Sequence, residues 1–96
     1  MKLRNSWQTA EGYLEEAFKL LPASVSVNPE DGSVAEYKEY ITQNEFELAL
    51  DELEHLGEVN KLPIEYWENL LNAAKEMGLA KNEKRYLEIL GAFGEG

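Results

Sequence analysis

Acidic side chains are concentrated in one stretch of this 96-residue chain. Residues 30–58 hold ten Asp and Glu side chains and a single base, Lys38, so they carry −9 of the formal net charge of −10. Four of the acids recur at i, i+4, i+7 and i+11, the spacing of one helix face: Glu47, Asp51, Glu54 and Glu58. Like charges one turn apart destabilise a helix, and natural surfaces usually intersperse the two signs. We therefore expect this stripe to attract a strongly basic partner.

Catalytic and metal chemistry have little support in the residues. The chain has one histidine, His55, no cysteine, no Gly-x-Ser-x-Gly elbow and no glycine-rich phosphate loop. His55 follows Asp51 by one helical turn, but a transition-metal site needs three or four converging ligands and there is no second histidine. Residues 28–39 resemble a calcium loop, yet Ser33 stands where that loop needs glycine. We expect no enzymatic activity, no metal and no cofactor.

The composition predicts one globular domain. With 44% hydrophobic residues, 2 Trp, 5 Tyr and 3 Phe, the chain differs from a disordered acidic tail. The absence of cysteine fits a reducing compartment, and no apolar run approaches the roughly 18 residues of a membrane span. A pI near 4.5 disfavours nucleic acid and anionic membranes as ligands. We expect a cytoplasmic protein.

The first third of the chain is expected to form a helix followed by a loop. Apolar residues follow a helical period over residues 1–21: Leu3, Trp7, Ala10, Leu14, Ala17, Phe18 and Leu21. Ser6 is a candidate N-cap, and Pro22 is expected to end the helix. Residues 22–33 are rich in turn formers and are expected to be a loop.

Residues 33–58 are expected to form a pair of acidic helices. Ser33 and Glu36 form a capping box that opens its first helix, which contains Tyr37, Tyr40 and Ile41. Asn44 is the expected N-cap of its second helix, with Gly57 as terminator.

Residues 63–93 are expected to form the C-terminal helices. Pro63 suits the first turn of one helix, Gly78 is expected to end it, and a last helix begins near Asn82. Residues between Pro63 and Gly78 are apolar over a broad surface, which indicates a central helix. The fold class expected for the whole chain is all-α, a compact bundle of four to five short helices.

Three segments carry a resemblance to a known family: Tyr40-Ile-Thr-Gln-Asn-Glu-Phe-Glu-Leu-Ala-Leu50, Ile64-Glu-Tyr-Trp-Glu68 and Ala73-Ala-Lys-Glu-Met-Gly-Leu79. Together they resemble the small bacterial immunity proteins of the Maf type, over roughly residues 36–90. Those proteins are related in role to the immunity proteins of contact-dependent growth inhibition systems. The resemblance implies a partner that is a cognate toxin domain, often a nuclease. It also implies that Asn44 and Glu45 lie at a turn between helices and that Tyr40, Ile41, Leu48 and Ala49 are structural.

The charge pattern and the resemblance together predict a partner-binding surface on the acidic helix pair. Its expected residues are Glu36, Tyr37, Glu39, Glu47, Asp51, Glu54, His55 and Glu58. Tyr37 and His55 are the candidate anchors, because desolvated aromatic side chains normally supply the affinity that charge alone does not.

Two other functions stay open at this stage. The chain is alternatively an adaptor or a self-associating regulatory module that uses an apolar surface, with Tyr66 and Leu70 as candidates. It is alternatively an acidic mimic of nucleic acid that acts on a DNA-binding protein. The sequence leaves open whether the chain is a monomer or a homodimer.

Overall fold

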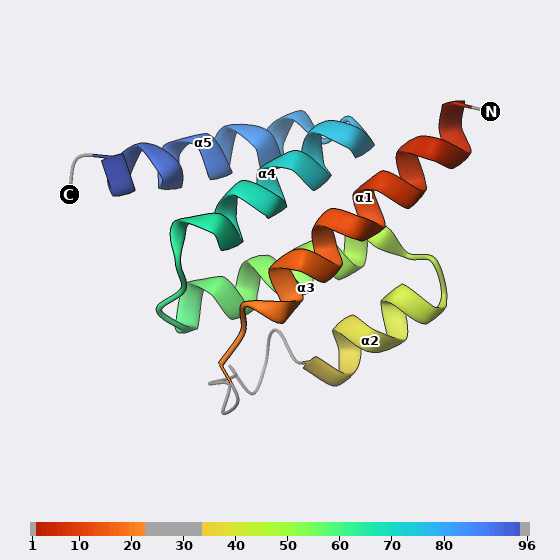
Figure 1. Cartoon of the computed structure of the whole chain (residues 1–96), viewed down its shortest axis with the longest axis horizontal. Coiled ribbons are helices and arrows are strands. Elements are labelled where there is room, and N and C mark those ends of the chain that lie inside the picture. Colours follow the sequence, from red (N-terminus) through yellow and green to blue (C-terminus); the bar gives the residue numbers. More distant parts are fainter. Residues whose placement is uncertain (1, 23–33, 95–96) are drawn as a thin grey trace.

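The architecture is all-α, as expected. A computed structural model describes residues 2–22 and 34–94, with side chains described for 8–22 and 34–93. The helices of the described residues are α1 (Lys2–Lys19), α2 (Val34–Thr42), α3 (Phe46–Val59), α4 (Ile64–Met77) and α5 (Ala80–Gly94) (Figure 1). The last helix begins two residues before the predicted Asn82. None of the described helices is long and apolar enough to cross a membrane.

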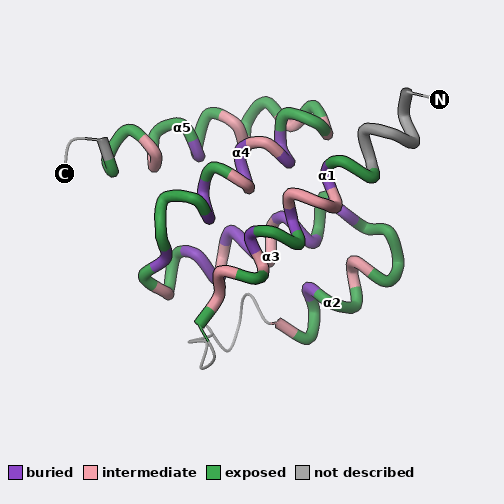
Figure 2. Tube along the Cα trace, in the orientation of Figure 1, coloured by how far each residue is buried: buried purple, intermediate pink, exposed green. Residues whose placement is uncertain are grey.

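The helices form a central group with one helix on either side. α1 packs mainly against α4 and also against α3, while α2 lies on α3 and α5 lies on α4. Figure 2 shows buried positions along α1, α3 and α4, whereas α2 and α5 are largely exposed. The larger core side chains are Leu14, Leu50, Leu53, Leu56, Tyr66, Trp67, Leu70 and Tyr86. The two outer helices therefore provide most of the surface available to a partner.

Tyr66 fixes α4 against α3. Its hydroxyl donates to the carbonyl oxygen of Leu53 at 2.5 Å, and its ring meets Trp67 edge-on at a centroid distance of 5.6 Å. Burial raises the pKa of the Tyr66 phenol far above its ordinary value, so the hydroxyl stays a donor. Tyr66 and Leu70 are both fully buried in the monomer. The prediction that these two residues form a self-association surface is wrong.

The turn between α2 and α3 is built on Asn44, in a different role from the predicted one. Asn44 has φ 61° and lies after the end of α2, where a left-handed residue closes the helix. The Glu45 N–H donates to the Tyr40 carbonyl at 2.8 Å, and the Asn44 N–H donates to Ile41 at 3.1 Å. Glu45, not Asn44, is the N-cap residue of α3. Asparagine tolerates both positions, so residue type alone did not distinguish them.

Other predicted helix ends have mixed outcomes. Gly78 closes α4 with φ 70°, as predicted, and Pro63 immediately precedes that helix. Ser6 lies inside α1 and not at its N-cap, so that prediction is wrong. Ser33, the loop 22–33 and the calcium-loop resemblance lie largely or wholly outside the described residues.

Gly57 does not terminate α3, which continues to Val59. A Cβ atom on Gly57 would lie 2.6 Å from Cζ2 of Trp67 and 2.9 Å from Cε2 of Tyr66. The glycine is therefore required by the close approach of α3 to the aromatic rings of α4, and the prediction of a helix terminator here is wrong.

Candidate functional site

The acidic stripe predicted on α3 is interrupted at Glu54. This side chain is buried, at 8% exposure, and makes two hydrogen bonds with the Arg85 guanidinium at 2.8 and 3.0 Å. The Tyr86 hydroxyl donates to the same carboxylate at 2.7 Å. Both partners come from α5, which is brought over α3 by its packing on α4. The expectation that Glu54 faces solvent beside Glu47 and Glu58 is wrong.

The Glu54 carboxylate is the centre of a polar network between α3 and α5. Asn82 donates to the Tyr86 hydroxyl at 3.2 Å and approaches an Asp51 carboxylate oxygen at 3.5 Å. The hydrogen bond to Glu54 raises the pKa of the Arg85 guanidinium, which keeps it charged. A carboxylate that is largely removed from water is tolerated here because an arginine and a tyrosine both donate to it.

Replacing Glu54 with glutamine is expected to destabilise the fold by about 1.5–3 kcal/mol. The amide keeps the shape of the side chain but turns an N–H group or a neutral oxygen toward Arg85, so the charge-assisted pair is lost. The measurement is urea unfolding followed by circular dichroism. Glu58→Gln is the control, because Glu58 is exposed one turn further on. Equal and small losses for the two variants would contradict a stabilising role for the Glu54 network.

Asp51 and His55 also differ from the predicted surface residues, since both are only half exposed. Partial burial raises the pKa of the Asp51 carboxyl. The hydrogen bond from Asn82 lowers this pKa by less, and the negative charge of Glu54 raises it further. The Nδ1 atom of His55 is buried and has no hydrogen-bond partner among the described residues. Asp51 and Glu54 therefore face α5, and this part of α3 is not an open acidic surface.

Asp51→Asn is expected to stabilise the protein at pH 7 by about 0.3 kcal/mol, or roughly 2 °C in Tm. The raised pKa means that the folded state disfavours the charged carboxylate, so the wild type loses stability as pH rises through that pKa. Below the ordinary value of 3.8 the carboxyl is protonated in both states, and the advantage of asparagine disappears. Thermal melts between pH 3 and 7 measure this, with the exposed Glu47→Gln as control. A gain independent of pH would contradict the assignment.

Tyr37 is not available as an anchor for a partner. Its exposure is 3%, and its ring stacks on Phe18 of α1 with centroids 4.9 Å apart and an interplanar angle of 13°. Burial raises the pKa of its phenol well above the ordinary value, and the charges of Glu15 and Glu11 add to that effect. Tyr37 joins α2 to α1 in the core, so the prediction of an exposed anchor is wrong.

The remaining predicted acids do lie on the surface. Glu36 and Glu39 on α2, and Glu47 and Glu58 on α3, are exposed as expected. The structure brings two of them together with acids that were not in the predicted set, around a different tyrosine. We define the Tyr40 patch as Tyr40, Glu36, Glu39, Glu45 and Glu52.

The Tyr40 patch combines a half-exposed phenol with four carboxylates from two helices and the turn between them. Desolvation of the phenol raises the pKa of Tyr40, and the negative charges of Glu36, Glu52, Glu39 and Glu45 raise it further. Glu39 also accepts a hydrogen bond from the Gln43 amide at 3.3 Å. The patch is therefore a region of negative potential with an aromatic ring in it.

Two neighbours define the character of this surface. Lys38, the one base in residues 30–58, is directed toward α1, with its Nζ atom 5.7 Å from the centroid of the Phe18 ring. Leu48 follows Glu45 by one helical turn, precedes Glu52 by one turn, and is 41% exposed. An apolar side chain thus stands among the acids of α3. The resemblance implied that Tyr40 and Leu48 are structural. Tyr40 is partly buried and packs against the core, as implied, whereas Leu48 is exposed.

Sequence reasoning missed Glu45 and Glu52 because it followed one face of one helix. The Tyr40 patch depends on the turn at Asn44, which places the end of α2 beside the start of α3. The available signal was the spacing of Glu45, Leu48 and Glu52, which also repeats at one face of α3.

Comparisons with protein-family models, with curated proteins and with solved structures found no match to this chain. Among the described residues, no three histidine, aspartate or glutamate side chains come together in a way that would hold a metal ion. Within that part of the chain, the Tyr40 patch is the arrangement that fits the predicted binding of a basic partner best.

Proposed function

We propose that this chain is a small immunity protein that binds a cognate bacterial toxin domain and neutralises it. The Tyr40 patch carries the proposal, because four carboxylates from α2, α3 and the turn between them act on one partly exposed aromatic ring. The toxin is a nuclease, whose phosphate-binding cleft supplies the complementary positive charge. The protein acts in the cytoplasm and catalyses no reaction.

The patch would act by occupying or flanking the basic cleft of the toxin. Complementary fields raise association rates toward about 10⁸–10⁹ M⁻¹s⁻¹ at low salt, which matters for a toxin that must be captured before it acts. Tyr40 and Leu48 then supply the apolar contact that charge does not. Exposed carboxylates around a ring also favour arginine, which pairs with carboxylates and stacks on aromatic faces.

The proposal is tested by growth of a bacterial host. The C-terminal domain encoded by the gene immediately upstream is expressed inducibly, with and without this chain. Rescue of growth by this chain establishes immunity and identifies the partner. A domain that is harmless, or that kills equally in both strains, would refute the proposal for that pair.

The salt dependence of the association rate then tests whether the acidic surface is what captures the toxin. The association rate with the purified toxin domain is expected to fall by at least about tenfold between 50 and 500 mM NaCl, since exposed charges are screened over shorter distances at high salt. An association rate that does not change with salt would exclude the acidic surface as the element that captures the toxin.

A further inference from the structure

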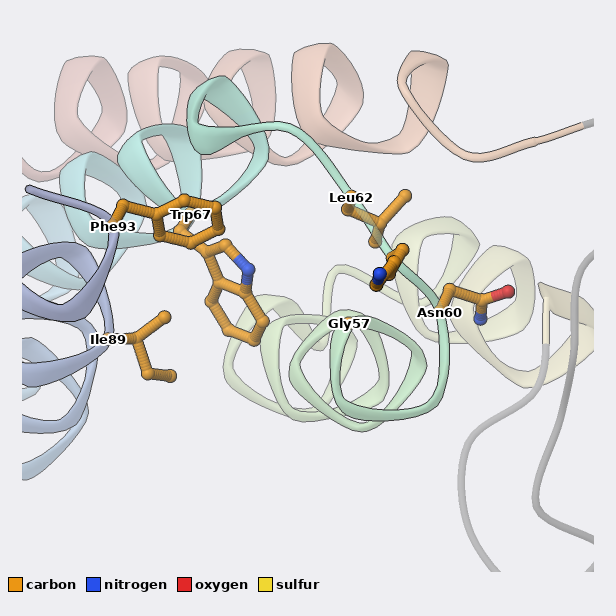
Figure 3. A pocket seen from close by; sticks show the side chains of 7 residues that line it. Gly57, Asn60, Leu62, Trp67, Ile89 and Phe93 are labelled. Carbon is orange, nitrogen blue, oxygen red and sulfur yellow. The ribbon is translucent and has the colours of Figure 1, made fainter. Parts of the chain in front are cut away.

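A second surface feature lies at the opposite end of α3 from the Tyr40 patch. An open pocket of about 500 Å³ is formed where the end of α3, the connection to α4 and the end of α5 meet. Its lining residues are Gly57, Asn60, Lys61, Leu62, Trp67, Ile89 and Phe93 (Figure 3). This volume is within the range of about 300–1,000 Å³ that is typical of small-molecule sites.

The pocket walls are apolar, and aromatic rings form a large part of them. Trp67 is held in place by Tyr66 and by Tyr86, whose ring centroid lies 6.0 Å from its own. Phe93 is 41% exposed, and Figure 3 shows it beside Trp67, with Ile89 below Phe93. Gly57 leaves the space in which the indole edge lies. A flat apolar group is a shape that packs well against such rings.

The polar groups of the pocket favour an anion. Lys61 is the only Lys or Arg between Lys38 and Lys75, and none of the seven lining residues is acidic in a chain with 19 acids. The indole of Trp67 adds an N–H donor, and Figure 3 shows its nitrogen on the ring edge that faces Leu62. A carboxylate or sulfonate attached to an apolar body would therefore meet donors here and no acidic side chain in the pocket lining.

We propose that this pocket binds a small amphipathic organic anion, with an aromatic or branched apolar body against Trp67 and Phe93 and its anionic group at Lys61. The site is distinct from the Tyr40 patch, because the two share no residue: Glu52, the patch residue nearest to Gly57 in the chain, precedes it by five residues, roughly 8 Å along α3. The inference goes beyond the proposed immunity function and does not depend on it.

The test uses the full chain and two matched probes, 1-naphthylacetate and the neutral 2-(1-naphthyl)ethanol. Binding is followed by NMR through the Trp67 indole N–H and the backbone amides of Gly57, Leu62 and Phe93. The anionic probe is expected to bind about tenfold more tightly than the neutral one, and Lys61→Met is expected to remove this difference. Lys75→Met, at an exposed lysine on α4, keeps it.

Three outcomes would overturn the inference. The first is equal affinity of the two probes in the wild type, which leaves an apolar surface without preference for an anion. The second is a probe response that spreads to resonances away from the pocket. The third is a dimer in sedimentation that is disrupted by Phe93→Ser, which would assign the pocket to a second copy of the chain.

Discussion

Replacing Glu39 and Glu45 with lysine is expected to slow association with the toxin domain by about a hundredfold at low salt. Both side chains are exposed, one on α2 and the other at the start of α3, and both act on the Tyr40 phenol. The double change takes the charge of the four acidic positions of the patch from −4 to 0, so it removes the negative potential where the partner must approach. Stopped-flow association with the purified toxin domain measures the rate, and growth with the toxin measures protection.

A control with the same net charge separates local from global electrostatics. Glu65→Lys together with Glu68→Lys changes the charge by the same amount at exposed positions of α4. Both variants are also measured at 0.1 M salt, where exposed charges separated by more than about 10 Å are largely screened, and there the control is expected to lose no more than a fewfold in rate. Equal losses in the two variants would show that net charge, and not the Tyr40 patch, governs capture.

Gly57→Ala is expected to destabilise the fold by about 2–3 kcal/mol, which corresponds to a fall in Tm of roughly 10–20 °C. The new methyl group would lie 2.6 and 2.7 Å from two carbons of the Trp67 ring, closer than carbon atoms approach in proteins. The Tyr66 ring, 2.9 Å from the same position, is fully buried and held by its hydrogen bond to Leu53, so it cannot move aside without disturbing the contact of α3 with α4. Thermal unfolding measures the loss.

Gly12→Ala supplies the matched control for Gly57→Ala. Gly12 is also inside a helix, but no atom lies within 4 Å of the position of its Cβ. Alanine there is expected to stabilise α1 by about 0.5–1 kcal/mol, since glycine is the poorer helix former. Replacement by alanine should thus lower the stability of the fold at Gly57 and raise it at Gly12. A stabilising Gly57→Ala would mean that α3 lies further from Trp67 than the structure indicates.

The helices followed closely from local patterns in the chain. Apolar residues at helical period located α1, α3, α4 and α5, and Gly78 ended α4 where a left-handed residue was expected. The roles of Gly57 and Asn44 were misassigned for a shared reason. A residue type that suits a helix end also suits a close helix crossing or a neighbouring cap, and only the packing distinguishes these uses.

The sequence predicted that the candidate site is an acidic surface, but it did not predict all of the residues that form it. Charge density in residues 30–58 predicted an acidic surface on the second and third helices, and Glu36, Glu39, Glu47 and Glu58 are exposed there. The spacing of the acidic residues in α3 could not show that α5 covers Glu54, because the contact joins Glu54 to Arg85, 31 positions later in the chain.

By itself, the sequence determined the helical class, the acidity of the two middle helices and the scarcity of bases among them, because these depend on composition and periodicity within single segments. Only the tertiary structure decided which carboxylates stay in water. Packing of α5 on α4 buried Glu54 against Arg85, the Phe18 ring of α1 stacked on Tyr37, and the turn at Asn44 gathered acids around Tyr40. Burial and electrostatic potential are sums over neighbours distant in sequence, so they exist only once the helices have packed.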